Sequence, residues 1–224
     1  MDAAKLRISS GDNGDRDKDK PHWRVSPEEI ALVRDPAWIL TKNSILARAV
    51  SLFAELSERW KGKLEDLPVP GPGLLSTAPK ISRGENYKGM PWVVLDYPRS
   101  FGKEDVFAIR TLFWWGHYFS VTLHLKGNPK QLYLPVIRQH IGELAAAGFH
   151  IGISGDEWRH ELEGGNYRSL EGMKPEEWEA ILVRPGFLKF SAKCGLEHWN
   201  EAGEEIGRLY GTVINALHTI SPRT

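Results

Sequence analysis

Hydrophobic residues recur at three- and four-residue steps in two long segments, one in the first third of the chain and one at its end. In residues 43–60 and 196–219 this spacing places them along one face of an α-helix. The two stripes consist of Leu46, Val50, Phe53, Leu56 and Trp60, and of Trp199, Ala202, Ile206, Leu209, Val213 and Leu217. We therefore predict a helix in each segment, and the second is a long C-terminal helix.

Start signals indicate shorter helices. Ser26 and Glu29 have the spacing of a capping box, with a proline between them at the first helical position. This helix is expected to end at Asp35, because a proline follows that residue, and the next helix is expected to begin near Asn43. Two further helices are predicted, in residues 132–146 and from Lys174 onward.

In the middle of the chain the hydrophobic period shortens towards two, which is typical of β-strands. Strands are predicted at residues 80–84, 92–97, 105–114, 118–125, 149–154 and 187–193. Residues 157–162 fit either a strand or a helix. Central strands with helices before and after them predict an α+β fold, in which flanking helices pack on a central, mainly antiparallel sheet.

The chain is expected to form one domain after a disordered tail. Residues 1–20 are polar and cannot bury enough apolar surface to become ordered. Residues 21–224 form the predicted single α+β domain. Its parts are a helical N-terminal part (26–60), a Pro/Gly loop (67–79), a sheet-rich part (80–193) and the C-terminal helix (196–219).

Residues 105–125 can pair as a hairpin in two registers, and a one-residue slip exchanges the two faces. A three-residue loop at 115–117 places Trp114 opposite Tyr118 and separates an apolar face from a polar one. A two-residue loop instead places Arg110 among apolar side chains, which is costly for an unpaired guanidinium. We therefore predict the first register. Its apolar face carries Phe107, Ile109, Phe113, Phe119, Val121 and Leu123, and its polar face carries Arg110, Trp114, Tyr118, Ser120 and His124.

The polar face is a candidate binding site. If the preceding strand is a neighbour, alternation allows Asp96, Arg110 and His124 to converge across three strands. Arg110 would then hold a carboxylate or phosphate bidentately, and His124 would donate or accept a proton near neutral pH. The alternative is a structural Asp–Arg pair beside a hydrogen-bonded histidine. The candidate set is completed by aromatic walls at Trp114, Tyr118 and Tyr87 and by anion anchors at Arg83 and Arg99.

Charge and cysteine content disfavour several functions. Lys and Arg total 29 and Asp and Glu total 29, so the chain lacks the basic excess typical of proteins that bind nucleic acid. The single cysteine, Cys194, excludes an internal disulfide and Cys-rich metal sites. It stands four residues before His198, but a buried thiol is a simpler interpretation than a nucleophile.

Metal and membrane signals are weak as well. Glu157 and His160 have the spacing of one half of a di-iron motif, but the second half is missing. No dinucleotide-binding or phosphate-loop fingerprint occurs, so we expect neither a metal nor a cofactor. No secretory signal or membrane-spanning run is found, and a soluble cytoplasmic protein without membrane contact is expected.

Two functions from different classes follow. The first is binding of a small or peptidic anionic ligand in an aromatic-walled cleft beside the sheet, and it leaves open whether the protein is an enzyme. The second is a protein-interaction module without catalytic activity. It uses Trp114 and Trp115 at the hairpin tip to bind a protein partner or a second copy of the chain. A third, nucleic-acid binding through the sheet aromatics, needs basic residues along one aromatic face.

Overall fold

The computed structural model describes residues 23–61 and 77–218. The chain divides into two compact units, one that ends at Asn43 and one that begins at Ser44. The first contains α1 (Pro27–Arg34) and the beginning of α2 (Pro36–Lys61), and the second contains the rest of α2 and the sheet. The predicted tail (1–20) and residues 67–76 of the predicted Pro/Gly loop lie outside the described residues.

The predicted capping box at the start of α1 is confirmed. The backbone N–H of Glu29 donates to Ser26 Oγ at 3.2 Å, and the Glu29 carboxylate accepts from the Ser26 N–H at 2.6 Å. The predicted start of the second helix near Asn43 is wrong, because α2 begins at Pro36. Asp35 Oδ1 accepts from the Ala37 N–H at 2.9 Å and so caps the new helix. The hydrophobic stripe does not mark the start of the helix, since the first turns of α2 contain no buried residue and the buried residues start at Leu46.

The sheet has seven strands in the order β1-β2-β3-β4-β7-β5-β6, and every strand pair in it is antiparallel. The strands are β1 (Lys80–Tyr87), β2 (Met90–Phe101), β3 (Val106–Trp114), β4 (Tyr118–Lys126), β5 (His150–Gly152), β6 (Tyr167–Ser169) and β7 (Phe187–Gly195). The predicted α+β class with a central antiparallel sheet is confirmed. The short strand β6 was not predicted.

The remaining helices differ from the prediction mainly at their ends. They are α3 (Asn128–Gln139), α4 (Ile141–Ala146), α5 (Pro175–Leu182), a 3-10 helix (Leu196–Glu201) and α6 (Ala202–Asn215). The predicted helix at 132–146 is two helices, which His140 separates by leaving the helical conformation. The predicted C-terminal helix is present as α6, and its first residues form the 3-10 helix instead.

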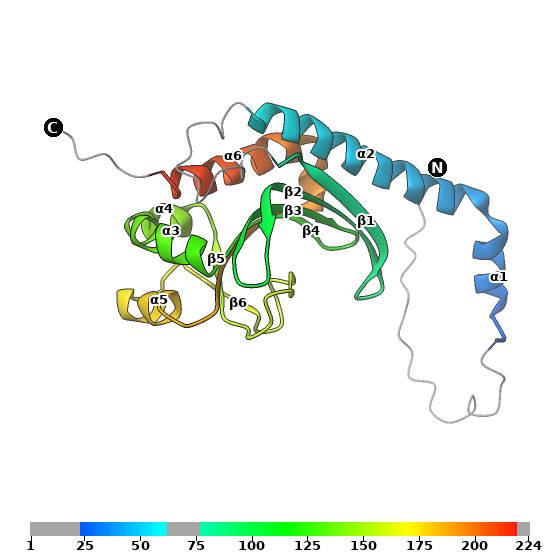
Figure 1. Cartoon of the computed structure of the whole chain (residues 1–224). Coiled ribbons are helices and arrows are strands. Elements are labelled where there is room, and N and C mark those ends of the chain that lie inside the picture. The colour runs from blue at the N-terminus through cyan, green and yellow to red at the C-terminus, as the bar shows by residue number, and fades with distance from the viewer. Residues whose placement is uncertain (1–22, 62–76, 219–224) are drawn as a thin grey trace, which may run out of the picture. The chain divides into compact units, whose positions relative to one another are not determined.

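One face of the sheet forms the core against helices. Figure 1 shows α6 and the C-terminal part of α2 on the same side of the strands. Phe53 of α2 lies against Phe119 of β4 with ring centroids 6.3 Å apart, and Trp60 stacks on Tyr210 of α6 at 3.6 Å. All six residues of the predicted apolar face are buried in this cluster: Phe107, Ile109, Phe113, Phe119, Val121 and Leu123.

The other face is covered over β3, β4 and β7 by residues 153–166. These residues form turns and irregular structure, so the prediction of a strand or helix at 157–162 is wrong. Polar side chains of the sheet hold this segment, which we call the covering loop (residues 153–166). The loop also contacts β1 through Tyr87, and a cavity lies between the loop and strands β1, β2 and β3.

Candidate functional site

The register of β3 and β4 places the candidate residues on one face. Trp114 pairs with Tyr118 and Phe113 with Phe119, so the predicted three-residue loop is confirmed. Cross-strand partners share a face. Two rows of partners on the polar face run across the sheet. They are Lys80–Asp96–Arg110–Thr122–Ser191 and Arg99–Ala108–His124–Lys189.

Asp96 and Arg110 form a bidentate ion pair on this face. Arg110 Nε donates to Asp96 Oδ1 at 2.7 Å, and Arg110 Nη2 donates to Asp96 Oδ2 at 2.9 Å. Asp96 is only 6% exposed, so its charge depends on this partner. The structure therefore brings two of the three predicted central residues together. His124 lies on the same face, in the neighbouring row.

His160 of the covering loop accepts a hydrogen bond from a third N–H group of Arg110. Arg110 Nη1 lies 2.9 Å from His160 Nε2. A guanidinium only donates, so Nε2 accepts and the imidazole proton is on Nδ1. Burial, together with the positive charges of Lys189 and Arg110, lowers the pKa of His160 well below its ordinary value. Three of the five N–H groups of Arg110 are thus engaged within the protein.

His124 does not exchange protons near neutral pH, which corrects the role expected from the sequence. It is 5% exposed, and burial, assisted by the charges of Lys189, Arg110 and Lys126, lowers its pKa to about 3. Its Nε2 lies 3.2 Å from Glu157 Oε2, but without the alignment of a hydrogen bond. The Trp158 ring packs against it in an edge-to-face arrangement at a centroid distance of 5.9 Å.

Tyr87 and Tyr118, predicted as walls, anchor the covering loop. The Tyr87 hydroxyl donates to the Glu161 carboxylate and accepts from the His160 N–H at 3.0 Å. The Tyr118 hydroxyl accepts from the Leu162 N–H at 2.9 Å. Although burial opposes it, hydrogen bonds from Tyr87 and neighbouring donors lower the pKa of Glu161 to about 2.

Lys189 of β7 fastens the middle of the covering loop. Its Nζ donates to the carbonyls of Glu157 at 3.0 Å and Arg159 at 2.7 Å. The side chain is buried, and burial and the charge of Arg110 lower its pKa to about 7. Sequence reasoning missed Lys189, although strict alternation along β7 assigns it to the polar face.

A cavity of about 410 Å³ opens beside β1, β2 and β3. From the predicted set it is lined by Tyr87, Asp96 and Arg110, and sequence reasoning missed Lys80, Trp92, Trp158 and His160. Trp92 shares a face with Asp96, so alternation alone identifies it. Trp158 and His160 belong to the covering loop, which has no hydrophobic period to read.

The other predicted residues lie outside this cavity. Trp114 is 4% exposed and donates its indole N–H to the Tyr87 carbonyl at 3.1 Å. Arg83 is paired with Val93, a core residue, so its exposed side chain is on the opposite face of β1. Arg99 reaches the polar face because a bulge between Asp96 and Arg99 shifts the register, but it does not line the cavity.

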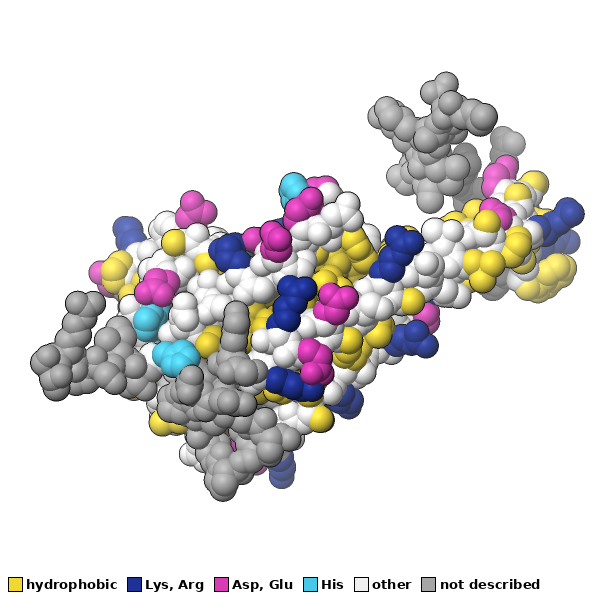
Figure 2. Space-filling view, turned by 90° about the horizontal axis from the view of Figure 1, so that it is seen from above, with side chains coloured by type: hydrophobic (Ala, Val, Ile, Leu, Met, Phe, Trp, Pro, Cys, Tyr) yellow, Lys and Arg dark blue, Asp and Glu magenta, His cyan; other side chains and the backbone are white. Residues whose placement is uncertain are grey.

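The hairpin tip does not present an exposed tryptophan pair. Trp114 is buried and Trp115 is half-buried, with its ring against Phe113 at 6.3 Å. Exposed large hydrophobic side chains are instead frequent in residues 23–40, where Val33 is 83% and Trp38 57% exposed. Figure 2 shows hydrophobic side chains gathered on α1 and the first turns of α2.

Several chemistries find no support in the described residues. No three His, Cys, Asp or Glu side chains of residues 23–61 and 77–218 come together to hold a metal ion. Burial, with nearby carboxylates, raises the pKa of the Cys194 thiol, the opposite of an activated nucleophile. No helix in these two ranges is long and apolar enough to cross a membrane.

No protein-family model, curated protein or solved structure matches the chain.

Proposed function

We propose that the protein binds a small or peptidic ligand, with a flat apolar part and one anionic group, in the cavity beside β1, β2 and β3. The observation that carries this proposal is the combination of three aromatic side chains with a paired charge in one cavity of about 410 Å³. This volume lies within the range of small-molecule sites, which are mostly apolar with a few polar groups.

The aromatic side chains supply the apolar contact. Tyr87, Trp92 and Trp158 line the cavity from β1, β2 and the covering loop. Such rings offer large contact areas to a planar group or to a side chain of a peptide. Trp158 is 52% exposed, so a ligand that covers it removes apolar surface from water.

The charges give the ligand its preferred sign. Asp96 neutralises Arg110 at bonding distance, so Arg110 does not act as a free fork for an external anion. Lys80, at the edge of the cavity and exposed, is the remaining cation among its lining residues. A carboxylate or phosphate beside Lys80, with the flat part between the aromatic rings, satisfies both features.

A fluorescence titration with benzoate and its uncharged analogue benzamide tests this function. We expect wild type to bind benzoate more tightly than benzamide. Lys80→Gln is expected to lower the ratio of the benzoate affinity to the benzamide affinity about threefold, or about 0.7 kcal/mol. Trp158→Ala is expected to weaken the binding of both probes. Arg83→Gln is the matched control, since it removes a cation from the other face of the same strand. Equal affinities for both probes in wild type, or a loss in Arg83→Gln equal to that in Lys80→Gln, would contradict the proposal.

A second candidate function is self-association through residues 23–40. α1 contains no buried residue, and helices that are apolar on several sides are normally covered by another surface. The segment carries three acidic and two basic residues, so its net charge of about −1 opposes pairing with a second copy only weakly. Sedimentation equilibrium of wild type and Trp38→Glu tests it. A monomeric wild type at high micromolar concentration, or a dimer that Trp38→Glu leaves intact, would exclude this function.

A further inference from the structure

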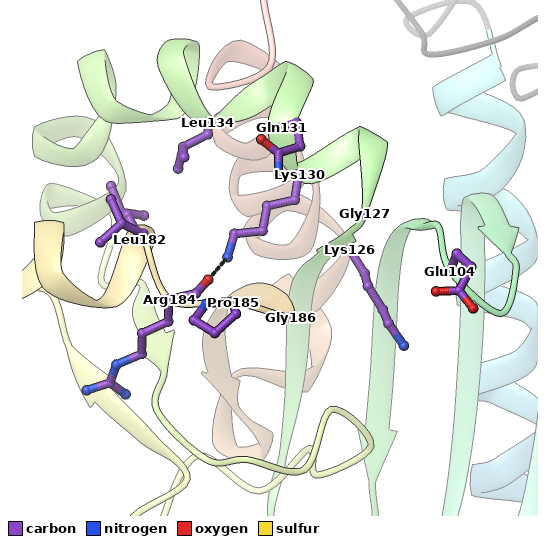
Figure 3. Close-up of a pocket in the computed structure, with 11 residues that line it drawn as sticks. Glu104, Lys126, Gly127, Lys130, Gln131, Leu134, Leu182, Arg184, Pro185 and Gly186 are labelled. Carbon is purple, nitrogen blue, oxygen red and sulfur yellow. Dashed lines mark hydrogen bonds between the residues drawn. The ribbon is translucent and has the colours of Figure 1, made fainter.

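A second cavity, of about 450 Å³, lies between the start of α3 and the turn that joins α5 to β7 (Figure 3). It shares no lining residue with the cavity beside β1, β2 and β3. Leu134, Leu182 and Pro185 give it apolar walls, and Lys130 and Gln131 bring polar groups from α3. Its lining therefore combines apolar contact surface with polar groups that can orient a bound molecule.

Lys130 is the unusual member of this cavity. The residue is 6% exposed, and its ammonium extends from α3 across the gap and donates to the Arg184 carbonyl (Figure 3). An ammonium has three N–H donors, and this carbonyl is the single acceptor that the described part of the chain gives it. No carboxylate of those residues pairs with it, and burial lowers the pKa of Lys130.

The surroundings add positive charge. Lys126 and Arg184 also line the cavity, whereas Glu104 is its one acidic residue. Lys126 is already paired with Glu157 at 3.0 Å, and the guanidinium of Arg184 points away from Lys130 (Figure 3). Arg184 is exposed to water, so Lys130 is the buried cation of this cavity that has no carboxylate partner among the described residues. A buried ammonium without a counter-charge is costly, and an oxyanion beside it removes that cost.

The start of α3 does not supply this counter-charge. Asp105 accepts from the Asn128 N–H at 2.8 Å and from the Asn128 side-chain amide at 3.0 Å. Its carboxylate thus accepts a hydrogen bond from the first N–H of the helix, but it makes no ion pair with Lys130. An anion in the cavity would depend on the side chain of Lys130 and not on the helix end.

We propose that this cavity is a second ligand site, which takes a small molecule bearing a phosphate or carboxylate group held by the ammonium of Lys130. The apolar walls contact the rest of the molecule, since a phosphate ion alone fills only part of the volume. The proposal is independent of the site beside β1, β2 and β3. Its competitor is a purely structural role, in which Lys130 only fastens α3 to the turn before β7.

Thermal unfolding of the full chain separates these roles. The probes are inorganic phosphate, glycerol phosphate and acetate at millimolar concentration, with chloride used to keep the ionic strength constant. Phosphate stabilises many proteins without binding them, so the comparison with Lys130→Met, which keeps the alkyl chain, is essential. We expect at least one probe to raise the Tm of wild type, and its apparent affinity to fall at least tenfold in Lys130→Met. Glycerol phosphate binding more tightly than phosphate identifies a phosphorylated molecule, and acetate binding most tightly identifies a carboxylate.

Two further variants keep the test decisive. Arg184→Gln changes an exposed side chain at the cavity and is expected to fold. It replaces Lys130→Met in the test if that variant does not fold. The expected loss of probe affinity is about threefold, because one positive charge near the cavity is removed. Lys80→Gln, in the other cavity, is expected to leave the affinity unchanged. The proposal is overturned if no probe stabilises wild type, if Lys130→Met responds as wild type does, or if Lys80→Gln alone loses the response. With Lys130→Met unfolded, an unchanged affinity in Arg184→Gln also overturns it.

Discussion

Asp96 and Arg110 face each other across β2 and β3, and two hydrogen bonds of 2.7 and 2.9 Å join them. The pair lies on the polar face of the sheet and lines the cavity beside β1, β2 and β3. The carboxylate is almost fully buried, and the guanidinium is 18% exposed. Arg110 also reaches His160, so the pair connects the sheet to the covering loop.

We expect the removal of one partner of this pair to destabilise the protein strongly. Asp96→Leu leaves the guanidinium without its counter-charge, and Arg110→Met leaves the carboxylate buried and unpaired. Each is expected to cost about 3 kcal/mol or more in the free energy of unfolding. The double variant Asp96→Leu/Arg110→Met has no unpaired charge and is expected to be more stable than either single variant. Urea unfolding of the four proteins measures this, and additive losses would contradict it.

Acid is expected to destabilise the protein through its buried histidines. The folded-state pKa of His124 is about 3, below the unfolded value of about 6.5, so the unfolded chain binds more protons between these values. Stability therefore falls as the pH falls from 6.5 towards 3, and His124 contributes about 2–3 kcal/mol of this loss by pH 4.5. Glu161, whose pKa is about 2, adds its own loss only below its ordinary value of 4.5.

His124→Gln is expected to flatten the fall in stability between pH 6.5 and pH 4.5. His160 retains its own contribution in this variant, so a smaller slope remains. His198→Gln is the control, because its side chain is largely exposed, and its pH profile should follow that of wild type. Denaturant midpoints at a series of pH values give the slopes, and identical slopes for His124→Gln and wild type would refute the assignment.

Lys189 is expected to control the mobility of the covering loop. Lys189→Met removes both hydrogen bonds to the loop carbonyls but keeps the buried chain length, so amide hydrogen exchange in residues 153–166 should become faster. Lys193→Met, on the same strand, removes a surface ion pair to Glu163 of the same loop, which is worth at most about 1 kcal/mol. Faster exchange in Lys193→Met than in Lys189→Met would contradict the prediction.

The same lysine is expected to make stability depend on pH in the alkaline range, with the same sign as the histidines have in the acidic range. Its folded-state pKa of about 7 lies below the ordinary 10.5, so the folded protein binds fewer protons between these values. The stability of wild type is therefore expected to rise with pH from 7 towards 10. In Lys189→Met part of this rise should disappear, and denaturant midpoints at pH 7.5 and 9.5 measure the difference.

The sequence predicts the sheet face better than the site on it. Alternation and the cost of an isolated guanidinium were enough to choose the register of β3 and β4, because strand periodicity reports which side chains share a face. Arg99 shows where that reasoning fails, since a bulge before it exchanges its face. Trp158 was missed and His160 was considered only as a metal ligand, because irregular segments have no period and their contacts depend on long-range packing. His124 had the expected place but not the expected chemistry, because its pKa depends on burial and on Lys189, neither of which is visible in the pattern.

Gly127 is expected to be the glycine least tolerant of substitution among the positive-φ glycines of residues 77–218. Its φ is 63° and its ψ −134°, a region that residues with a side chain rarely adopt. A Cβ at this position would also lie 2.5 Å from the Glu104 carbonyl and would collide with the Asp105 carboxylate that caps α3. Gly127→Ala must therefore strain the backbone and displace the helix cap together.

Gly116 in the hairpin loop is the matched comparison. Its φ is also positive, at 75°, but a Cβ there meets no atom within 4 Å. Gly116→Ala is expected to cost only the backbone term of about 1–2 kcal/mol, and Gly127→Ala at least about 2 kcal/mol more, through the lost cap and the clash. In a domain of this size that difference corresponds to a Tm lower by about 4–8 °C. Thermal unfolding of the two variants decides the matter, because equal Tm values would mean that the turn before α3 moves aside at no cost and that Asp105 does not hold it.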